Sequence, residues 1–155
     1  MSNIWIDAGS LLVAILAFCV ALLNYHKYKI LTVQYNTMVH TQTLTAQGAL
    51  ETQIRSAIAA VTHDIVALAV EIEKNPESKM LQYAYSAAEE SYRNAYEDAC
   101  GKYMDGKIDK ERFKKMYQRE IRRLVEEEPH KQSYMGVQTP YVSTVAVYKE
   151  WYSQP

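Results

Sequence analysis

A run of sixteen uncharged, mostly apolar residues near the N-terminus constrains this chain more than any other feature. The run, AGSLLVAILAFCVALL, extends from Ala8 to Leu23. With its flanks it reaches the roughly 20 residues that a helix needs to cross the hydrocarbon core of a bilayer. Trp5 before the run and Tyr25 after it stand where aromatic residues anchor membrane helices at the interface. We therefore predict a transmembrane anchor within residues 1–28.

A signal peptide and a buried soluble helix are the alternatives to a retained anchor. A signal peptide has a basic segment before its apolar run and small residues at a cleavage site after it. Here Asp7 precedes the run and CVALLNYHKYK closes it, which favours an anchor that is kept. Lys27 and Lys29 follow the span and no basic residue precedes it, so the positive-inside rule places the C-terminus in the cytoplasm. We expect a single-pass protein of the cell inner membrane, in contact with membrane lipid.

The segment after the anchor is polar, yet it carries no formal charge between Lys29 and Glu51. Neither Pro nor Gly occurs between Gly9 and Gly48, so the membrane helix can continue beyond the bilayer as a stalk over residues 29–53. Two other interpretations of this stretch remain. It could be a frayed linker, or a helix that lines a water-filled cavity beneath a pore.

Steps of three and four residues from Ile30 to Ile72 follow one helical face, which we call the core register. A sustained heptad repeat is typical of helices that wrap around one another, and polar residues at core positions can set oligomer number. The second half of the register is apolar throughout, which fits either an interface between copies or an amphipathic helix packed on its own domain. We predict a homo-oligomer and leave these two interpretations open. The positions are Ile30, Val33, Thr37, His40, Leu44, Gln47, Glu51, Ile54, Ile58, Val61, Ile65, Leu68 and Ile72.

The remainder of the chain, residues 54–155, predicts a small helical domain. Gly and Pro are scarce, at 5 and 4 residues, which disfavours a turn-rich β fold. Asn75-Pro76 ends one helix and Ser78 can cap the next; after the turn MDGKID, Asp109 can cap a third. We expect a helix for YVSTVAVYKEWY, although its β-branched residues also permit a strand. The predicted fold class is all-α: a single transmembrane helix, a stalk and a small cytoplasmic helical domain.

Catalytic and metal-binding signatures fail when they are tested against the sequence. YMDGKIDKERF partly matches a calcium-binding loop, but Arg112 stands where the bidentate Glu belongs. The pair His63-Asp64 has no further His at ligand spacing, and no Gly-rich phosphate loop, zinc signature or nucleophile elbow occurs. Cys19 and Cys100 are too few for a disulfide framework. We expect no enzymatic activity, no cofactor and no metal.

A basic stripe, formed by Arg112, Lys115, Arg119 and Arg122, recurs at steps of three and four residues and so shares one helix face. The net charge of −1 gives the chain no global preference for anions, so any such preference is local. The stripe can hold an anion beside a base-stacking tyrosine, or touch anionic lipid headgroups. The alternative is a solvated face neutralised by 126–128 and by acids of the preceding helix. The candidate ligand-binding residues are Arg112, Lys115, Tyr117, Arg119, Arg122, His130, Lys131 and Tyr134.

The C-terminal half, SYRNAYEDACGKYMDGKIDKERFKKMYQREIRRLVEEE followed by AVYKEWY, resembles a segment of small, largely uncharacterised one-span bacterial membrane proteins. The whole layout joins an N-terminal membrane helix to a small domain without catalytic motifs. In this it resembles the cyclic-oligoadenylate-binding membrane effectors of type III CRISPR defence. That resemblance implies a tetramer that binds cyclic tetra-adenylate and perturbs the membrane.

Two functions from different classes follow as hypotheses. In the first, the protein is a membrane-anchored antiviral defence effector whose cytoplasmic domain binds a cyclic oligonucleotide second messenger on the basic stripe. In the second, it is a passive single-pass membrane scaffold that recruits a cytoplasmic protein through a surface rich in tyrosine, of which the chain has 13.

Overall fold

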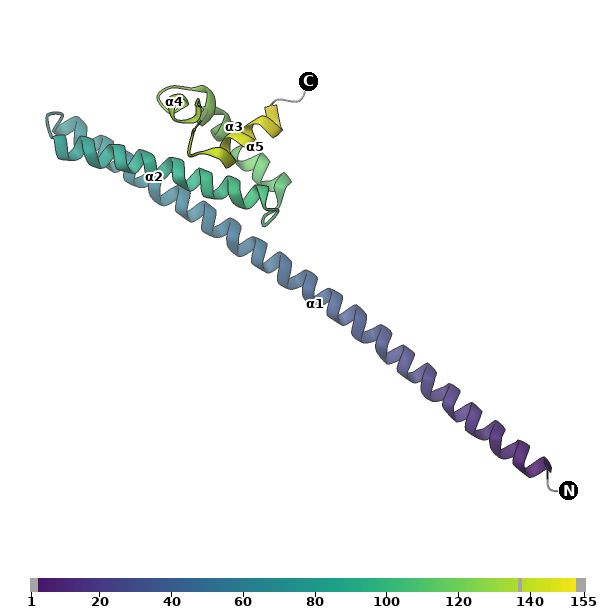
Figure 1. Cartoon of the computed structure of the whole chain (residues 1–155). Coiled ribbons are helices and arrows are strands. Elements are labelled where there is room, and N and C mark those ends of the chain that lie inside the picture. The colour runs from purple at the N-terminus through teal and green to yellow at the C-terminus, as the bar shows by residue number, and fades with distance from the viewer. Residues whose placement is uncertain (1–2, 137, 153–155) are drawn as a thin grey trace. The chain divides into compact units, whose positions relative to one another are not determined.

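The computed structural model describes residues 3–136 and 138–152, and the side chains from residue 10 onward within those ranges. The predicted interfacial anchor Trp5 lies outside the described side chains. Every element in the described part is a helix (Figure 1), which confirms the all-α class and the helical form of the last segment. The helices are α1 (Asn3–Lys74), α2 (Lys79–Met104), α3 (Lys110–Glu126), α4 (Lys131–Tyr134) and α5 (Val142–Tyr152).

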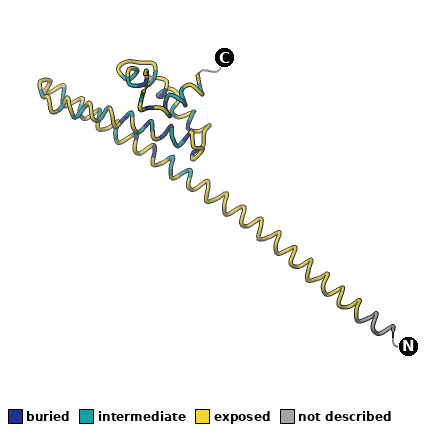
Figure 2. The backbone as a smooth tube through the Cα atoms, viewed as in Figure 1, coloured by how far each residue is buried: buried dark blue, intermediate teal, exposed yellow. Residues whose placement is uncertain are grey.

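Two compact units divide the chain, Met1–Thr45 and Ala46–Pro155. In the first unit every described side chain, from residue 10 to residue 45, is exposed (Figure 2). An 18-residue window of this helix has a mean hydropathy of 1.7, and none of it is buried. Large exposed apolar surfaces mark sites of contact with lipid or protein. Within the described residues, one helix could thus span a membrane by its length and composition.

The predicted helix boundaries in the second unit are set by local capping. The Ser78 hydroxyl accepts a hydrogen bond from Leu81 N at 3.4 Å at the start of α2. The Asp109 carboxylate accepts one from Arg112 N at 2.9 Å at the start of α3. Between the two helices Gly106 adopts a φ of 67°, a left-handed conformation that glycine reaches without steric cost. Both predicted N-caps are confirmed.

Tyrosine side chains build much of the core of the second unit. Tyr92, Tyr96, Tyr103, Tyr134 and Tyr141 are all buried. Tyr92 and Tyr96 pack edge to face with their ring centroids 5.1 Å apart, and Tyr134 and Tyr141 lie 4.9 Å apart. Such aromatic pairs contribute roughly 0.5–1.5 kcal/mol beyond the area that they bury. These five rings are therefore not available to a cytoplasmic partner in this conformation.

The end of α1 belongs to this core as well. α2 turns back alongside it (Figure 1), and Ile54 and Ile58 are buried within the tyrosine-rich cluster, while Val61 and Ile65 pack against its edge. Four of the six positions in the apolar half of the core register therefore pack on their own domain, which was one of the two open interpretations. Leu50 also packs against this core, and the second compact unit includes the residues of α1 from Ala46 onward.

Candidate anion-binding face

The basic stripe occupies the solvent face of α3. All four of its members, Arg112, Lys115, Arg119 and Arg122, are exposed. On the opposite side of the helix Phe113, Ile121 and Leu124 are buried in the core. Because apolar and basic residues alternate at helical spacing, burying one set forces the other into solvent. The prediction that these four cations share one face is confirmed.

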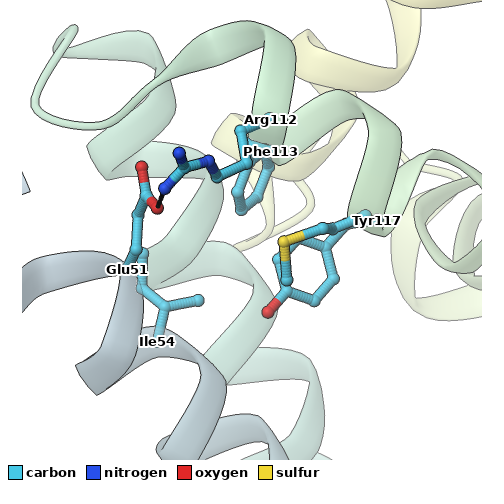
Figure 3. A pocket seen from close by; sticks show the side chains of 6 residues that line it. Glu51, Ile54, Arg112, Phe113 and Tyr117 are labelled. Atoms are coloured by element: carbon cyan, nitrogen blue, oxygen red, sulfur yellow. Dashed lines mark hydrogen bonds and ion pairs between the residues drawn. The ribbon is translucent and has the colours of Figure 1, made fainter. Parts of the chain in front are cut away.

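Arg112 is engaged by a carboxylate from α1. Its Nη1 donates a hydrogen bond to Glu51 Oε2 at 2.9 Å (Figure 3), and Glu51 Oε1 also accepts one from Asp109 N at 3.4 Å. The hydrogen bond and charge of Glu51 raise the pKa of Arg112 above its ordinary value. This ion pair closes over a hollow of about 10 Å³, lined also by Ile54 and Phe113, which is too small for an organic ligand. Arg112 therefore ties α1 to α3.

Arg122 is engaged by residues at the other end of the stripe. Its Nε donates to Glu126 Oε2 at 2.9 Å, and its guanidinium lies 5.5 Å from the ring centroid of Tyr152. Tyr148 donates a second hydrogen bond to Glu126 at 2.6 Å. The hydrogen bond from Tyr148, followed by that from Arg122, lowers the pKa of Glu126. The predicted neutralisation by residues 126–128 is thus seen at Glu126.

Lys115 and Arg119 are different, because neither forms an ion pair with any carboxylate that the structure describes. Two acids were candidate partners for Arg119. Glu97 instead binds the start of α5, and Glu120 binds Arg123. The two cations in the middle of the stripe are consequently exposed and available to an external anion.

A broad groove of about 580 Å³ lies along α3 beside Arg119, and Lys115 is not part of its lining. Arg119, Arg122 and Arg123 line it together with three glutamates. Arg123 also donates to the Tyr92 hydroxyl at 3.4 Å. Arg123 was not among the predicted site residues, although it follows Arg119 by four residues and therefore satisfies the same helical spacing. An anion in this groove can contact Arg119 directly and compete with glutamates for the other two.

The two tyrosines predicted to stack a base belong to the core. Tyr134 is only 3% exposed, so no base can stack on it in this conformation. Tyr117 is half-buried, with its ring centroid 4.9 Å from that of Phe113 and 6.0 Å from that of Tyr96. The helical spacing that put Tyr117 beside the stripe also put it at the edge of the buried face, and packing decided its position.

His130 and Lys131 lie beyond the stripe, where α3 leads into α4. His130 is partly buried, with its ring centroid 6.0 Å from that of Tyr92, and burial lowers the pKa of its imidazole. It lines a smaller hollow of about 220 Å³ that shares Arg123 with the groove. Lys131 is partly buried and lies close enough to Glu126 to affect its charge. These two residues adjoin the groove but are not part of its lining.

Comparisons with known proteins add no identity to this geometry. No family model matches the sequence, and neither the curated proteins nor the solved structures include a match. Among the described side chains, no group of three or more His, Cys, Asp or Glu residues is arranged to hold a metal ion. The candidate site therefore rests on the charge and exposure of α3.

Proposed function

We propose that this protein is a single-pass inner-membrane effector whose cytoplasmic domain binds an anionic, phosphate-bearing ligand on the exposed face of α3. The observation that carries the proposal is that Lys115 and Arg119 are exposed and have no carboxylate partner within the described structure. Guanidinium and ammonium groups in that state bind phosphate oxygens through charge-assisted hydrogen bonds.

The ligand class follows from the shape and charge of the face. The groove is shallow and polar, and it offers several cations in a row and no deep apolar pocket. A ligand with several phosphates on a compact frame, such as a cyclic oligonucleotide, suits that surface better than a neutral metabolite does. The resemblance of the layout to type III CRISPR effectors makes cyclic tetra-adenylate the specific candidate, with membrane perturbation in antiviral defence as the outcome.

In a homo-oligomer, a short basic stripe on each chain is enough to bind a ligand with several phosphates. One chain offers two stripe cations, Lys115 and Arg119, that pair with no described carboxylate. A symmetric assembly presents the same two from every copy around one axis. A cyclic ligand with one phosphate per subunit can then meet Arg119 of each copy. A tetramer matches a ring of four phosphates, which is the state that the resemblance implies.

Charge reversal at Arg119 tests this proposal. We expect cyclic tetra-adenylate to release heat when it is titrated into the full chain in lipid nanodiscs, and Arg119→Glu to abolish that heat. Because an exposed substitution shifts stability by only about 0.5 kcal/mol, helicity should not change. Lys79→Glu is the matched control, since Lys79 is exposed and lies on α2 away from the stripe. Equal loss of binding in both variants, or no heat with the wild type, would remove the proposal.

The scaffold remains a second candidate because two large side chains at the start of α2 are almost fully exposed. Met80 is 81% exposed and Tyr83 is 79% exposed, and Met and Tyr are both enriched at protein interfaces. A scaffold would give no heat with the nucleotide, and its partner binding would be lost with Tyr83→Ser and kept with Arg119→Glu. The two candidates therefore make opposite predictions for the same pair of variants.

A further inference from the structure

The core register of the stalk continues upstream into the apolar run. Steps of four and three residues back from Ile30 reach His26, Leu23, Cys19 and Leu16 in turn. His26 and His40 thereby occupy the same heptad position two repeats apart, about 21 Å along the helix. All of these side chains are exposed in the described structure, so this part of the register has no partner in its own chain.

A surface hollow of about 310 Å³ lies on this face of the first unit. Its lining includes His26, Lys29, Ile30 and Val33. In a coiled coil, four residues at this spacing form the hole that receives one side chain from a neighbouring helix. Downstream, Ile54, Ile58, Val61 and Ile65 of the register are covered by the protein's own domain. This hole is open, and its geometry fits another helix with the same repeat.

The absence of charge points to a second copy of this chain as that helix. In a parallel homotypic assembly each residue lies next to its own copy, so every charge near the interface faces a like charge. The segment between Lys29 and Glu51 has none. A membrane anchor would hold all copies parallel, which is the arrangement in which this property matters. Between Lys29 and Glu51 a charged partner finds no residue of opposite charge.

The threonine hydroxyls of the stalk already form hydrogen bonds within the helix. Thr37, Thr41, Thr43 and Thr45 each donate a hydrogen bond from Oγ1 to the carbonyl oxygen four residues earlier, at 2.9 Å. Their hydroxyl hydrogens are therefore satisfied within the helix, and burying them against another copy leaves no donor unpaired. The stalk is less polar in a helix–helix contact than its sequence indicates.

His40 is a polar residue at a core position of this interface, so its burial needs a physical reason. At a core position its imidazole would meet the imidazoles of the other copies on the assembly axis. Polar core residues cost stability unless they find partners. Converging imidazoles are the preferred ligands of Zn²⁺ and of other divalent metals at the end of the first transition series.

We propose that the stalk is a parallel interface between copies of this chain, and that the His40 side chains on its axis bind a divalent transition-metal ion of the Zn²⁺ type. This inference rests on the homo-oligomer of the proposed function and assigns its contact surface. The metal site is created by assembly, with one ligand from each copy.

Cysteine cross-linking tests the interface. In a Cys19→Ser chain held in lipid nanodiscs, Thr37→Cys places a thiol in the core register, whereas Gln42→Cys places one on the outer face of the same helix. We expect a metal-free oxidant, diamide, to link Cys-bearing copies of the Thr37→Cys variant at least tenfold faster than those of the Gln42→Cys variant. Equal or reversed rates would overturn the interface and the stalk-mediated oligomer together.

Zinc titration tests the metal site separately. The full chain carrying His26→Ala isolates the His40 position, and ZnCl₂ is titrated into it by calorimetry with MgCl₂ as the comparison ion. We expect Zn²⁺ to bind, at least a tenfold loss of affinity on adding His40→Ala, and no change on adding His63→Ala, an exposed histidine of α1 in the second unit. Efficient cross-linking with Zn²⁺ binding unaffected by His40→Ala would overturn the metal site while leaving the oligomer intact. Ligand binding on α3 is measured independently of both.

Discussion

Glu97 controls whether α5 docks on the rest of the second unit, and its replacement should be the most destabilising single change outside the apolar core. From α2 its carboxylate accepts hydrogen bonds from Ser143 N at 2.7 Å, Thr144 N at 2.9 Å and Thr144 Oγ1 at 2.8 Å. The two amides belong to the first turn of α5, where the helix has no internal acceptors for them. Thr144 is completely buried, so water cannot replace the lost acceptor.

The magnitude follows from those three contacts. A hydrogen bond to a charged group contributes about 1.5–3 kcal/mol, and each donor left buried and unpaired costs about 1–3 kcal/mol. Allowing for shared geometry and partial relaxation, we expect Glu97→Ala to lower the free energy of unfolding by about 3–5 kcal/mol. Glu97→Gln keeps one acceptor oxygen without the charge, so its loss should be about 1–2 kcal/mol.

Urea unfolding of the full chain in detergent, followed by circular dichroism at 222 nm, measures this difference. Glu90→Ala is the matched control, because Glu90 is an exposed glutamate on the same helix and should change stability by less than about 0.5 kcal/mol. If Glu97→Ala unfolds at the same urea concentration as Glu90→Ala, the capping argument is wrong.

Three further predictions address topology, burial and packing. A reporter fused to the C-terminus of the wild type should be active in the cytoplasm, and activity only in the periplasm would contradict the topology. Replacing Lys27 and Lys29 with glutamate should give chains of both orientations, so that part of the reporter activity moves to the periplasm. Burial raises the pKa of the Cys100 thiol to about 12. In a Cys19→Ser chain at pH 8, maleimide should therefore label Cys100 only after urea unfolds the protein. Labelling of Cys100 in the folded protein would contradict this prediction. Because only the unfolded thiol ionises above about pH 8.5, the contribution of Cys100 to stability should fall as pH rises past that value. Ile58→Lys should lower the free energy of unfolding by about 3–5 kcal/mol, because Ile58 is buried in the core and a lysine there has no partner; unchanged urea unfolding would refute it.

Sequence signals of short range predicted the elements well. Asn75-Pro76, Ser78 and Asp109 act within one helical turn, so their residue types alone determine where α1 ends and where α2 and α3 begin. The exposure of the basic stripe could also be predicted, because α3 carries ten charged residues and has one apolar face to bury. These features depend on local chemistry and on helical periodicity.

Contacts between distant segments were not accessible in the same way. Glu97 caps a helix 46 residues further along the chain. Glu51 pairs with Arg112, which is 61 residues away. No local sequence pattern predicts either contact. Tyr117 was predicted to flank the basic stripe from helical spacing, and Tyr134 because it follows the helix closely in the sequence. In this fold the rings bury their area, and several hydroxyls reach carboxylates at the core's edge, as Tyr103 does to Glu150 at 2.6 Å. Whether each ring is buried or exposed depends on the tertiary packing around it.

The salt dependence of ligand binding tests the central claim most directly, since the proposed site holds its ligand through exposed cations. Cyclic tetra-adenylate titrated into the full chain in nanodiscs should bind, and its affinity should fall by roughly tenfold or more when salt rises from about 50 mM to about 200 mM. Uncyclised adenosine, which has no phosphate, is the comparison ligand and should not bind. Binding that is insensitive to salt, or equal binding of adenosine, would show that the cations of α3 do not hold the ligand and would contradict the account.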